Sequence, residues 1–485
     1  MNKKKSFLLI IFLFLLIFFF YGCAEEIAPI EKRSGIWEGT TKFGIFIFMV
    51  DPSGRFINRI EYEHFQNCDR KRYPKWEIQH PSEGWPIDDN NSFDLEIGHS
   101  KRKEKFNGEF NSASTVATGR WRISIDCSSK FRATKCSPAL IQDLNPNPPT
   151  LKVWGSPIIK SISLVVKQSY PNLEYKKSAL ITQTIVEILN RMGIRIIADN
   201  EKSDATLTID LTGKAVSAYY FTIGSSSGSK GNDYYLGAEV KGKINLTAPG
   251  HDTLNFTIYE KISPPLSLVP GNRPNNPESA PIYSACMKAI LRVFSTDLWG
   301  PQVIVQSLWG PTNMSLYTTA KYELKKYGRE SLLALLEVFR NDECELDIRI
   351  AAARELGELF SPDPLVVYEL NEILNKSKST DIRLRKTAAL ALGELGSKSG
   401  GDIVIESILQ ALQNESCTLR MAGAEALERM GAKAGDKAIF SLINALEKNE
   451  SEWMRTRYGV ALTKITGKKF WDDVKKWKRW MKQQK

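Results

Sequence analysis

The sequence predicts three folded parts in series: a small antiparallel β sandwich or barrel, an α+β domain and an all-α solenoid. Strand-like runs separated by turn residues fill residues 33–140. A strand–helix–strand pattern, three more strands and a closing helix fill residues 151–300. A repeat of 35 to 36 residues fills residues 312–485. A chain of 485 residues with 42% apolar content can build three separate cores.

Short strand-like runs separated by turn residues make up the first part, and apolar and polar residues alternate over residues 55–62. Residues 36–41 and 43–50 read as strands, and Asp51-Pro-Ser-Gly54 is a turn signal. Further strands are expected at 55–62 and 118–125. Regular spacing of this kind implies an antiparallel sandwich or small barrel, and we expect side chains to fill its interior.

The second part follows a proline-rich linker, residues 144–149. Residues 158–167 read as a strand, and residues 175–192 as an amphipathic helix with isoleucines on one face. Four strands come next, and residues 279–298 form the closing helix before Gly300-Pro301. This order predicts an α+β layer with its helices on one face of the sheet.

Four near-copies define the repeat in the third part. Each contains an arginine at the same position of the repeat, which we call the phase arginine. A small residue follows it four positions later and a leucine seven positions later, which is the spacing of one face of a helix. The arginines are Arg349, Arg385, Arg420 and Arg455, and the leucines are Leu356, Leu392, Leu427 and Leu462. The expected N-caps are Asp381, Ser416 and Ser451, with Glu345 as a poorer one. We expect Gly396, Gly400, Gly401 and Gly431 to separate the two helices of each hairpin.

The run Asp381-x-x-x-Arg385…Ala389…Leu392-Gly393 resembles the HEAT repeats of bacterial proteins, including the HEAT-like repeats of phycobiliprotein lyases. The resemblance implies a HEAT-repeat α-solenoid over residues 312–485 that serves as a binding scaffold, without a catalytic residue to carry over. The second helices carry Glu337, Glu369, Glu372, Gln410 and Glu447, so we expect a polar or basic protein partner.

The N-terminal residues predict export. Lys3-Lys4-Lys5 precedes an apolar run over residues 7–20, which is typical of a signal peptide spanning residues 1–22. Phe20-Tyr21-Gly22-Cys23 resembles the lipobox of bacterial lipoproteins, and the resemblance implies lipidation of Cys23. It also implies the periplasmic face of the outer membrane if the host has two membranes. Removing three lysines lowers the formal charge from +11 to +8. A lipid on Cys23 would attach the protein to the membrane without any contribution from its charged surface. We therefore do not take the net positive charge as a sign that the protein binds nucleic acid.

Of the seven cysteines, Cys68, Cys127 and Cys136 fall in the β-rich part. A small β domain common in bacterial exported proteins resembles this part in the order Gly35…Trp37…Gly39-Thr40, Cys68, Phe106-x-Gly108-x-Phe110, Gly119-x-Trp121 and Cys127. The resemblance implies a disulfide between Cys68 and Cys127. Cys286, Cys344 and Cys417 lie in predicted helices, and we expect buried thiols.

No pattern for catalysis or metal binding is present in the sequence. None of the four histidines has a second ligand at zinc-site spacing, and Glu61, Glu63 and His64 read as a solvated strand edge rather than a metal cluster. Phosphate-loop, nucleophile-elbow and C-x-x-C motifs are missing. We therefore expect no enzyme activity, no cofactor and no metal.

The last residues, 467–485, read as a basic helix with Phe470, Val474, Trp477 and Met481 in one stripe. We expect it to seal the last repeat; a helix lying on anionic lipid is the alternative. The leading functional prediction is a lipid-anchored cell-envelope adaptor that binds a protein through its HEAT surface. The alternatives are a ligand-binding β-barrel lipoprotein and a lyase-like ligand handler with the repeats as an accessory.

Overall fold

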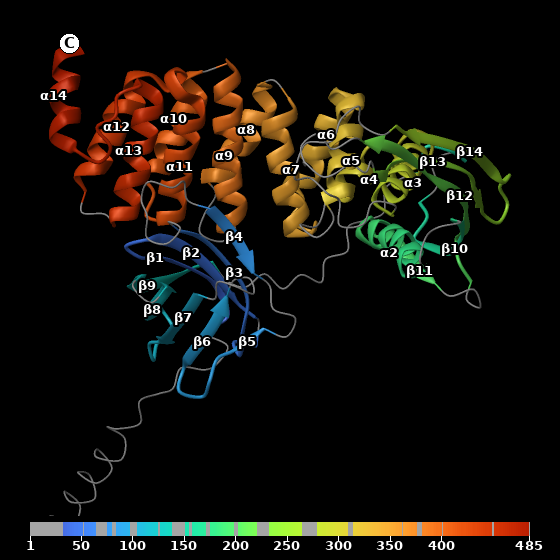
Figure 1. Cartoon of the computed structure of the whole chain (residues 1–485), viewed down its shortest axis with the longest axis horizontal. Coiled ribbons are helices and arrows are strands. Elements are labelled where there is room, and N and C mark those ends of the chain that lie inside the picture. Colours follow the sequence, from blue (N-terminus) through green and yellow to red (C-terminus); the bar gives the residue numbers. More distant parts are fainter. Residues whose placement is uncertain are drawn as a thin grey trace, which may run out of the picture. The chain divides into compact units, whose positions relative to one another are not determined.

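The computed structural model (Figure 1) describes residues 33–51, 53–64, 75–79, 84–97, 104–124, 127–137, 151–154, 158–170, 175–197, 202–220, 232–263, 279–308, 314–360, 362–375, 381–399, 401–448 and 451–484. The chain divides into two compact units. One contains residues 1–141 with residues 371–485, and the other contains residues 142–370. The predicted fold class is confirmed: a nearly closed antiparallel barrel, a mixed sheet and a helical region. The predicted signal peptide, Cys23 and Cys68 lie outside the described residues.

The barrel is a nine-stranded antiparallel sheet whose path runs β4-β3-β2-β1-β9-β8-β7-β6. Its strands are β1 (Gly35–Thr40), β2 (Gly44–Val50), β3 (Phe56–His64), β4 (Lys75–Gln79), β5 (Trp85–Pro86), β6 (Ser92–Ile97), β7 (Glu104–Phe110), β8 (Val116–Ser124) and β9 (Cys127–Ser137). The short strand β5 pairs with β3, and a bridge between Ile87 and Phe93 leads on to β6. The sheet therefore nearly closes on itself.

Aromatic side chains fill the described interior of the barrel. Trp37, Phe46, Phe106 and Trp121 are all buried in one cluster, with ring centroids of Phe46 and Phe106 4.6 Å apart. The strands approach closely at Gly119, where a Cβ would lie 2.0 Å from the Asn107 carbonyl oxygen. This close packing agrees with the expectation of a filled interior.

The mixed sheet has the strand order β11-β10-β12-β13-β14. Its strands are β10 (Ser161–Ser169), β11 (Arg195–Ile197), β12 (Ala205–Tyr220), β13 (Asn232–Thr247) and β14 (Leu254–Ile262). β10 runs parallel to β11 and β12, and the remaining pairs are antiparallel. Helix α3 (Ser279–Val293) packs on β12, β13 and β14, and also meets α2 (Tyr175–Arg191). A π-helical turn, Phe294–Leu298, continues α3.

Paired helices make up the rest of the chain, coloured yellow to red in Figure 1. They are α4 (Gln302–Gln306), α5 (Met314–Leu324), α6 (Arg329–Arg340), α7 (Leu346–Leu359), α8 (Pro364–Asn375), α9 (Ile382–Ser399), α10 (Asp402–Leu412), α11 (Cys417–Met430), α12 (Gly435–Glu447), α13 (Glu452–Thr466) and α14 (Val474–Gln484). We call α7, α9, α11 and α13, which carry the phase arginines, the first helices. We call α6, α8, α10 and α12 the second helices. In the described part of the chain, no helix has the length and apolar character needed to cross a membrane.

The predicted N-caps Asp381 and Ser416 accept the expected hydrogen bonds from amides in the first turn of their helices. Asp381 Oδ1 accepts the Arg383 amide at 2.7 Å, and Ser416 Oγ accepts the Leu419 amide at 3.2 Å. Glu345 makes no capping bond through its side chain. One prediction was wrong, because Gly396 lies inside α9 and does not separate two helices. A Cβ there would lie 2.8 Å from the Met430 side chain, so this glycine allows α9 to approach α11.

Candidate functional site

The phase arginines bind carbonyl groups at or just beyond the ends of helices. Arg349 Nε donates to the Phe339 carbonyl at 3.0 Å, and Arg385 Nε donates to the Leu374 carbonyl at 3.0 Å. These carbonyls lie in the last turns of α6 and α8, where helices have no internal donor to offer. Both arginines are buried. Each therefore joins a first helix to the second helix before it.

The later repeats vary this arrangement. Arg420 Nη1 donates to the carbonyls of Asn414 and Glu415, at 2.9 and 2.6 Å, in the loop before α11. Arg455 Nη2 donates to the Asp472 carbonyl at 3.2 Å. The four predicted leucines are fully buried: Leu356, Leu392, Leu427 and Leu462. The residues that define the repeat thus serve packing and helix ends, and they leave no group aimed at a ligand.

Within the unit that contains both, the barrel meets the first helices through charged side chains. Glu38 Oε2, on β1, accepts hydrogen bonds from Ser416 Oγ at 2.8 Å and from the Thr418 amide at 3.2 Å. The carboxylate thus lies at the N-terminus of α11, where the helix dipole favours a negative charge. Sequence reasoning missed this contact, because a separation of 378 residues leaves no local pattern to find.

The predicted solvated edge at Glu61 and Glu63 was wrong, because both carboxylates are buried. Glu61 pairs with Arg59 at 2.7 Å and lies 3.7 Å from Arg383 Nη1 on α9. Burial raises the pKa of Glu63, although the charges of Arg457 and Lys386 oppose the shift. These faces of α9 and α11 are therefore occupied by the chain's own barrel. The described residues hold no cluster suited to a metal ion.

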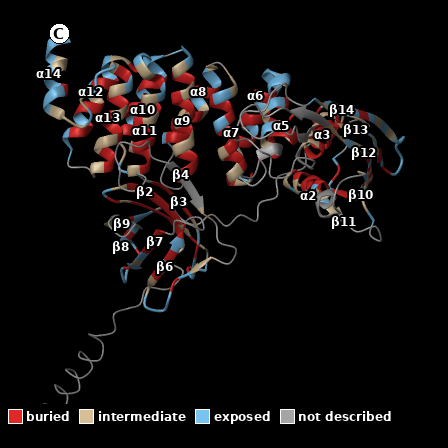
Figure 2. Ribbon diagram, in the orientation of Figure 1, coloured by how far each residue is buried: buried red, intermediate tan, exposed pale blue. Residues whose placement is uncertain are grey.

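The second helices expose large apolar side chains, which sequence reasoning did not single out. On α6 and α8, in one unit, Leu333 is 48% exposed and Tyr368 is 57% exposed. On α10 and α12, in the other, Ile403 is 72% exposed and Phe440 is 54% exposed. Figure 2 shows the pale-blue exposed faces of these helices beside their red buried faces. We call Ile403 and Phe440, with the exposed charged residues Asp402, Glu406, Asp436 and Lys437 on the same two helices, the outer stripe.

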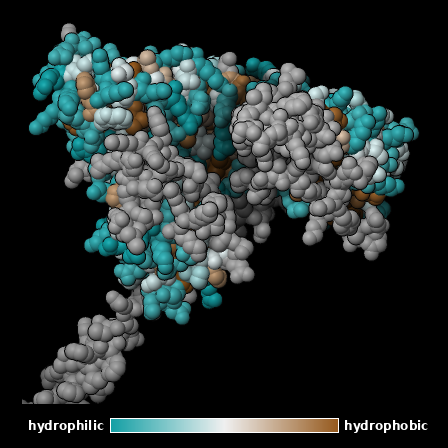
Figure 3. Space-filling model, viewed as in Figure 1, coloured by the Kyte–Doolittle hydropathy of each residue, from teal (hydrophilic) through white to brown (hydrophobic). Residues whose placement is uncertain are grey.

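Charged residues flank the apolar positions of the outer stripe. An ion pair joins neighbouring second helices in each unit: Arg340 to Glu369 at 2.7 Å, and Lys437 to Glu406 at 2.6 Å. Asp402 and Asp436 are also exposed. The visible face of the helical region is mainly teal in Figure 3, with small brown patches among polar residues. The stripe therefore combines isolated apolar side chains with a surplus of carboxylates on α10 and α12.

Three of the five polar residues expected to face a partner already have partners. Glu369 pairs with Arg340, Glu447 pairs with Lys478, and Glu337 accepts a bond from Gln302 at 3.4 Å. Glu372 and Gln410 are exposed. Helix contacts inside the chain thus use part of the predicted charge, which a sequence pattern does not reveal.

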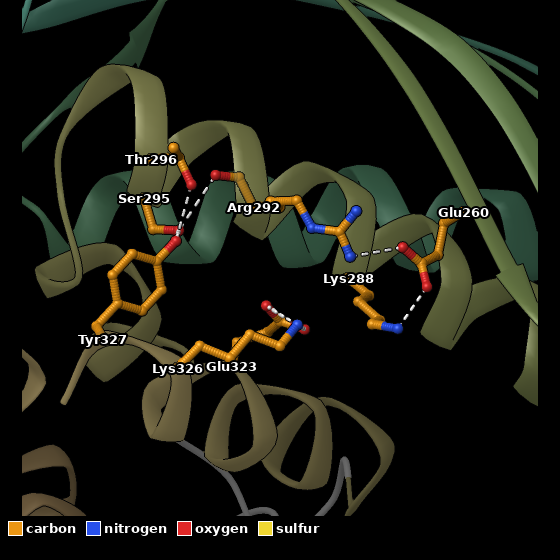
Figure 4. A network of polar contacts seen from close by, with 8 residues as sticks. All are labelled: Glu260, Lys288, Arg292, Ser295, Thr296, Glu323, Lys326 and Tyr327. Atoms are coloured by element: carbon orange, nitrogen blue, oxygen red, sulfur yellow. Dashed lines mark hydrogen bonds and ion pairs between the residues drawn. The ribbon is translucent and has the colours of Figure 1, made fainter.

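A second feature is the polar network around α3 and β14 (Figure 4). Buried Glu260 pairs with Lys288 and, at 2.7 Å, with Arg292. The Tyr327 hydroxyl bonds to the hydroxyls of Ser295 at 2.6 Å and Thr296 at 2.8 Å. A cavity of about 370 Å³ lies beside it, lined in part by Tyr259, Arg292 and Asp297. Because Arg292 is already paired with Glu260, this network fastens α3 to the sheet.

Neither Cys286 nor Cys344 forms a disulfide. Cys286 and Cys344 are buried free thiols, as predicted, whereas Cys417 is only half-buried. Burial raises the pKa of Cys286 to about 12, and its sulfur lies 3.2 Å from the Tyr170 hydroxyl. A thiol with such a pKa is a poor nucleophile at neutral pH. The pairing of Cys68 with Cys127 stays a prediction, because Cys68 and the Cys127 side chain lie outside the described part.

Comparisons with known proteins return weak structural likenesses only. No known family matches the sequence, and no curated protein does. Among solved structures, the CpcE–CpcF complex of phycocyanin lyase from Nostoc sp. PCC7120 is 18% identical, with a TM-score of 0.28. That match covers 33% of this chain and 96% of the other. An engineered protein is 19% identical with a TM-score of 0.25, covering 38% of this chain and 84% of the other.

Proposed function

We propose that the protein is a lipid-anchored scaffold of the cell envelope and that the outer stripe binds a protein partner. The observation that carries this proposal is the recurrence of an exposed apolar side chain on each second helix: Leu333, Tyr368, Ile403 and Phe440. Single exposed apolar residues are ordinary, but the same helix of successive repeats presents one each time. Within one unit, the packed helices α10 and α12 present two of them, and stacked repeats bind proteins through surfaces of this kind.

The stripe also suggests the chemistry of the partner. Asp402, Glu406 and Asp436 surround Ile403 and Phe440, and Lys437 contributes one opposing charge. An amphipathic helix with basic residues beside its apolar ones would complement this surface. No nucleophile paired with a base emerges in the described part, so we propose binding without catalysis, cofactor or metal.

The lipid anchor rests on the sequence alone. The basic start, the apolar run and Cys23 support a leader that is cleaved before a lipidated cysteine. Replacing Cys23→Ser should abolish incorporation of labelled palmitate. Unchanged palmitate labelling of the Cys23→Ser protein would contradict lipidation at this position.

The ligand-handling alternatives gain no support from the barrel. Its described interior is filled by aromatic side chains, including Trp37, Phe46 and Trp121. A ligand would have to displace them from a packed cluster. In the cavity beside α3, the Arg292 guanidinium is already paired with Glu260. The scaffold therefore remains the better supported proposal.

Site-specific photocrosslinking in cells tests the scaffold. A photoreactive amino acid at Phe440 should crosslink one reproducible envelope protein through a basic amphipathic segment. The same amino acid at Tyr259, which is 53% exposed on β14, serves as the control position. Replacing Ile403→Ser should reduce the Phe440 crosslink without changing stability, because Ile403 is exposed. Equal crosslinking from both positions, or none from Phe440, would overturn the proposal.

A further inference from the structure

The apolar side of α14 is already used inside the protein. Trp477 is fully buried, its ring centroid lies 4.9 Å from that of Phe470, and its Nε1 donates to the Trp471 carbonyl at 2.8 Å. The helix packs against α12, with an ion pair between Lys478 and Glu447. These contacts agree with the sequence-based expectation that α14 seals the last repeat.

The opposite side of α14 is basic. Lys475, Arg479 and Lys482 are exposed and follow at i, i+4 and i+7, which places them along one face of the helix. Lys468 and Lys469 are exposed in the preceding segment. We call these five residues the basic cap. Among the described residues, none of the five has an ion-pair partner.

The carboxylates nearest in sequence do not neutralise the basic cap. Asp473 lies 3.3 Å from Lys476, and Asp472 lies 3.9 Å from Arg455, neither of which belongs to the cap. Gly467–Lys485 contains eight Lys and Arg residues against these two aspartates. The cap is therefore a concentrated positive surface at the end of the helical region.

An exposed tryptophan lies beside this positive surface. Trp471 is 53% exposed, and its backbone takes a left-handed conformation, with φ of 53°. Such a conformation is uncommon for a residue other than glycine. Along the sequence, Trp471 stands between Lys468-Lys469 of the basic cap and the start of α14. A tryptophan with basic neighbours is the combination that favours the interface between lipid headgroups and acyl chains.

We propose that the basic cap binds the phosphate headgroups of an anionic phospholipid bilayer, with Trp471 at the headgroup level. Because Trp477, the central residue of the apolar side of α14, is buried against the repeats, the helix does not insert. Binding is instead electrostatic, and salt weakens it. Anionic lipid is favoured over nucleic acid because Trp471 presents a ring suited to the bilayer interface. This contact is separate from the proposed lipid on Cys23.

Vesicle co-sedimentation tests the proposal. The protein used begins at Ala24, which keeps every described residue and omits both the apolar leader and Cys23. Vesicles of phosphatidylcholine with phosphatidylglycerol should bind the protein at low salt, and pure phosphatidylcholine vesicles should not. Replacing Lys475→Gln, Arg479→Gln and Lys482→Gln together should weaken binding by about 100-fold, at roughly fivefold per charge. Trp471→Ser should weaken it by less.

A matched variant controls for net charge. Lys160→Gln, Lys202→Gln and Lys243→Gln remove three exposed lysines from the mixed-sheet part and should leave vesicle binding unchanged. Circular dichroism checks that each variant is folded. Three results would each overturn the proposal. They are equal binding to neutral vesicles, equal loss in the two triple variants, and binding to single-stranded DNA without binding to anionic vesicles.

Discussion

The first and second helices of the repeats use their side chains in opposite ways. Helices α7 and α9 bury their arginines: Arg349 and Arg385 bind helix-end carbonyls, and Arg383 faces Glu61 of the barrel. The second helices expose apolar groups such as Ile403 and Phe440. The residues that recur in every repeat are therefore already engaged in contacts within the protein. The surface available to a partner is made of residues that vary from repeat to repeat.

The comparison also explains why a repeat signature says little about function. Arginine, small residue and leucine recur because every repeat must solve the same packing problem. At Gly459, the small residue four positions after Arg455, a Cβ would lie 2.3 Å from the Trp471 carbonyl oxygen, so α13 needs a small residue there. The exposed apolar side chains of the second helices also recur, but they differ in residue type, as at Ile403 and Phe440, so no repeated residue type marks them in the sequence.

The largest expected difference in stability is between substitutions of a buried and of an exposed apolar residue on neighbouring helices. Leu427→Ala, in α11, should lower stability by about 3 kcal/mol, because it leaves a cavity in a packed core. Phe440→Ala, in α12, should change it by less than about 0.5 kcal/mol. Native-state hydrogen exchange of the α11 amides measures both. Equal losses would show that Phe440 is a packing residue.

A smaller difference is expected between two arginines. Arg385→Met removes the donor to the Leu374 carbonyl and should cost about 2 kcal/mol, because a buried acceptor loses its partner. Arg340→Met breaks an exposed ion pair with Glu369 and should cost less than about 1 kcal/mol. Urea unfolding compares the two variants. A larger loss for Arg340→Met would reverse the assignment of structural and surface roles.

The contact of the barrel with α11 should have a modest effect. Glu38→Gln keeps the shape of the side chain but removes the charge at the helix N-terminus. We expect a loss of about 1 kcal/mol, which high salt reduces. Thermal unfolding at low and high salt measures it, with the exposed Glu406→Gln as the control. A stability unchanged at both salt concentrations would show that the Glu38 charge is unimportant.

The smallest effects are pH-dependent and opposite in sign. Burial raises the pKa of Glu63, so its ionisation disfavours the folded state as pH rises through that raised value. Glu63→Gln should therefore stabilise the protein at neutral pH and have little effect below the ordinary pKa of glutamate. Burial also opposes ionisation of Glu425, but Arg429, Arg457 and Lys386 outweigh it and lower its pKa.

Glu425 thus stabilises the fold above the ordinary glutamate pKa, and this stability is lost as pH falls through the lowered value. Glu425→Gln should destabilise the protein at neutral pH, with the difference disappearing in acid. Urea unfolding of both variants at a series of pH values tests the pair. The same sign of change at neutral pH in both would contradict this electrostatic picture.

Local sequence patterns determined much of the architecture. The period of Arg349, Arg385, Arg420 and Arg455 placed the helices, and the caps at Asp381 and Ser416 placed their starts. Both signals lie within one or two turns of chain, where helical spacing and unpaired amides dictate the residue type. Alternation over residues 55–62 likewise indicated a strand, because strand side chains alternate between two faces.

Only the tertiary structure decided how charged residues are used. Glu38 and Glu61 appear in the sequence as ordinary polar strand residues, yet both are buried against first helices more than 300 residues away. Gly396 appeared to end a helix, but the approach of Met430 explains it. Whether Ile403 and Phe440 are exposed likewise depends on which sides of α10 and α12 are covered by neighbouring helices. Spacing along the chain determines an element, whereas partners distant in sequence determine which of its side chains remain exposed.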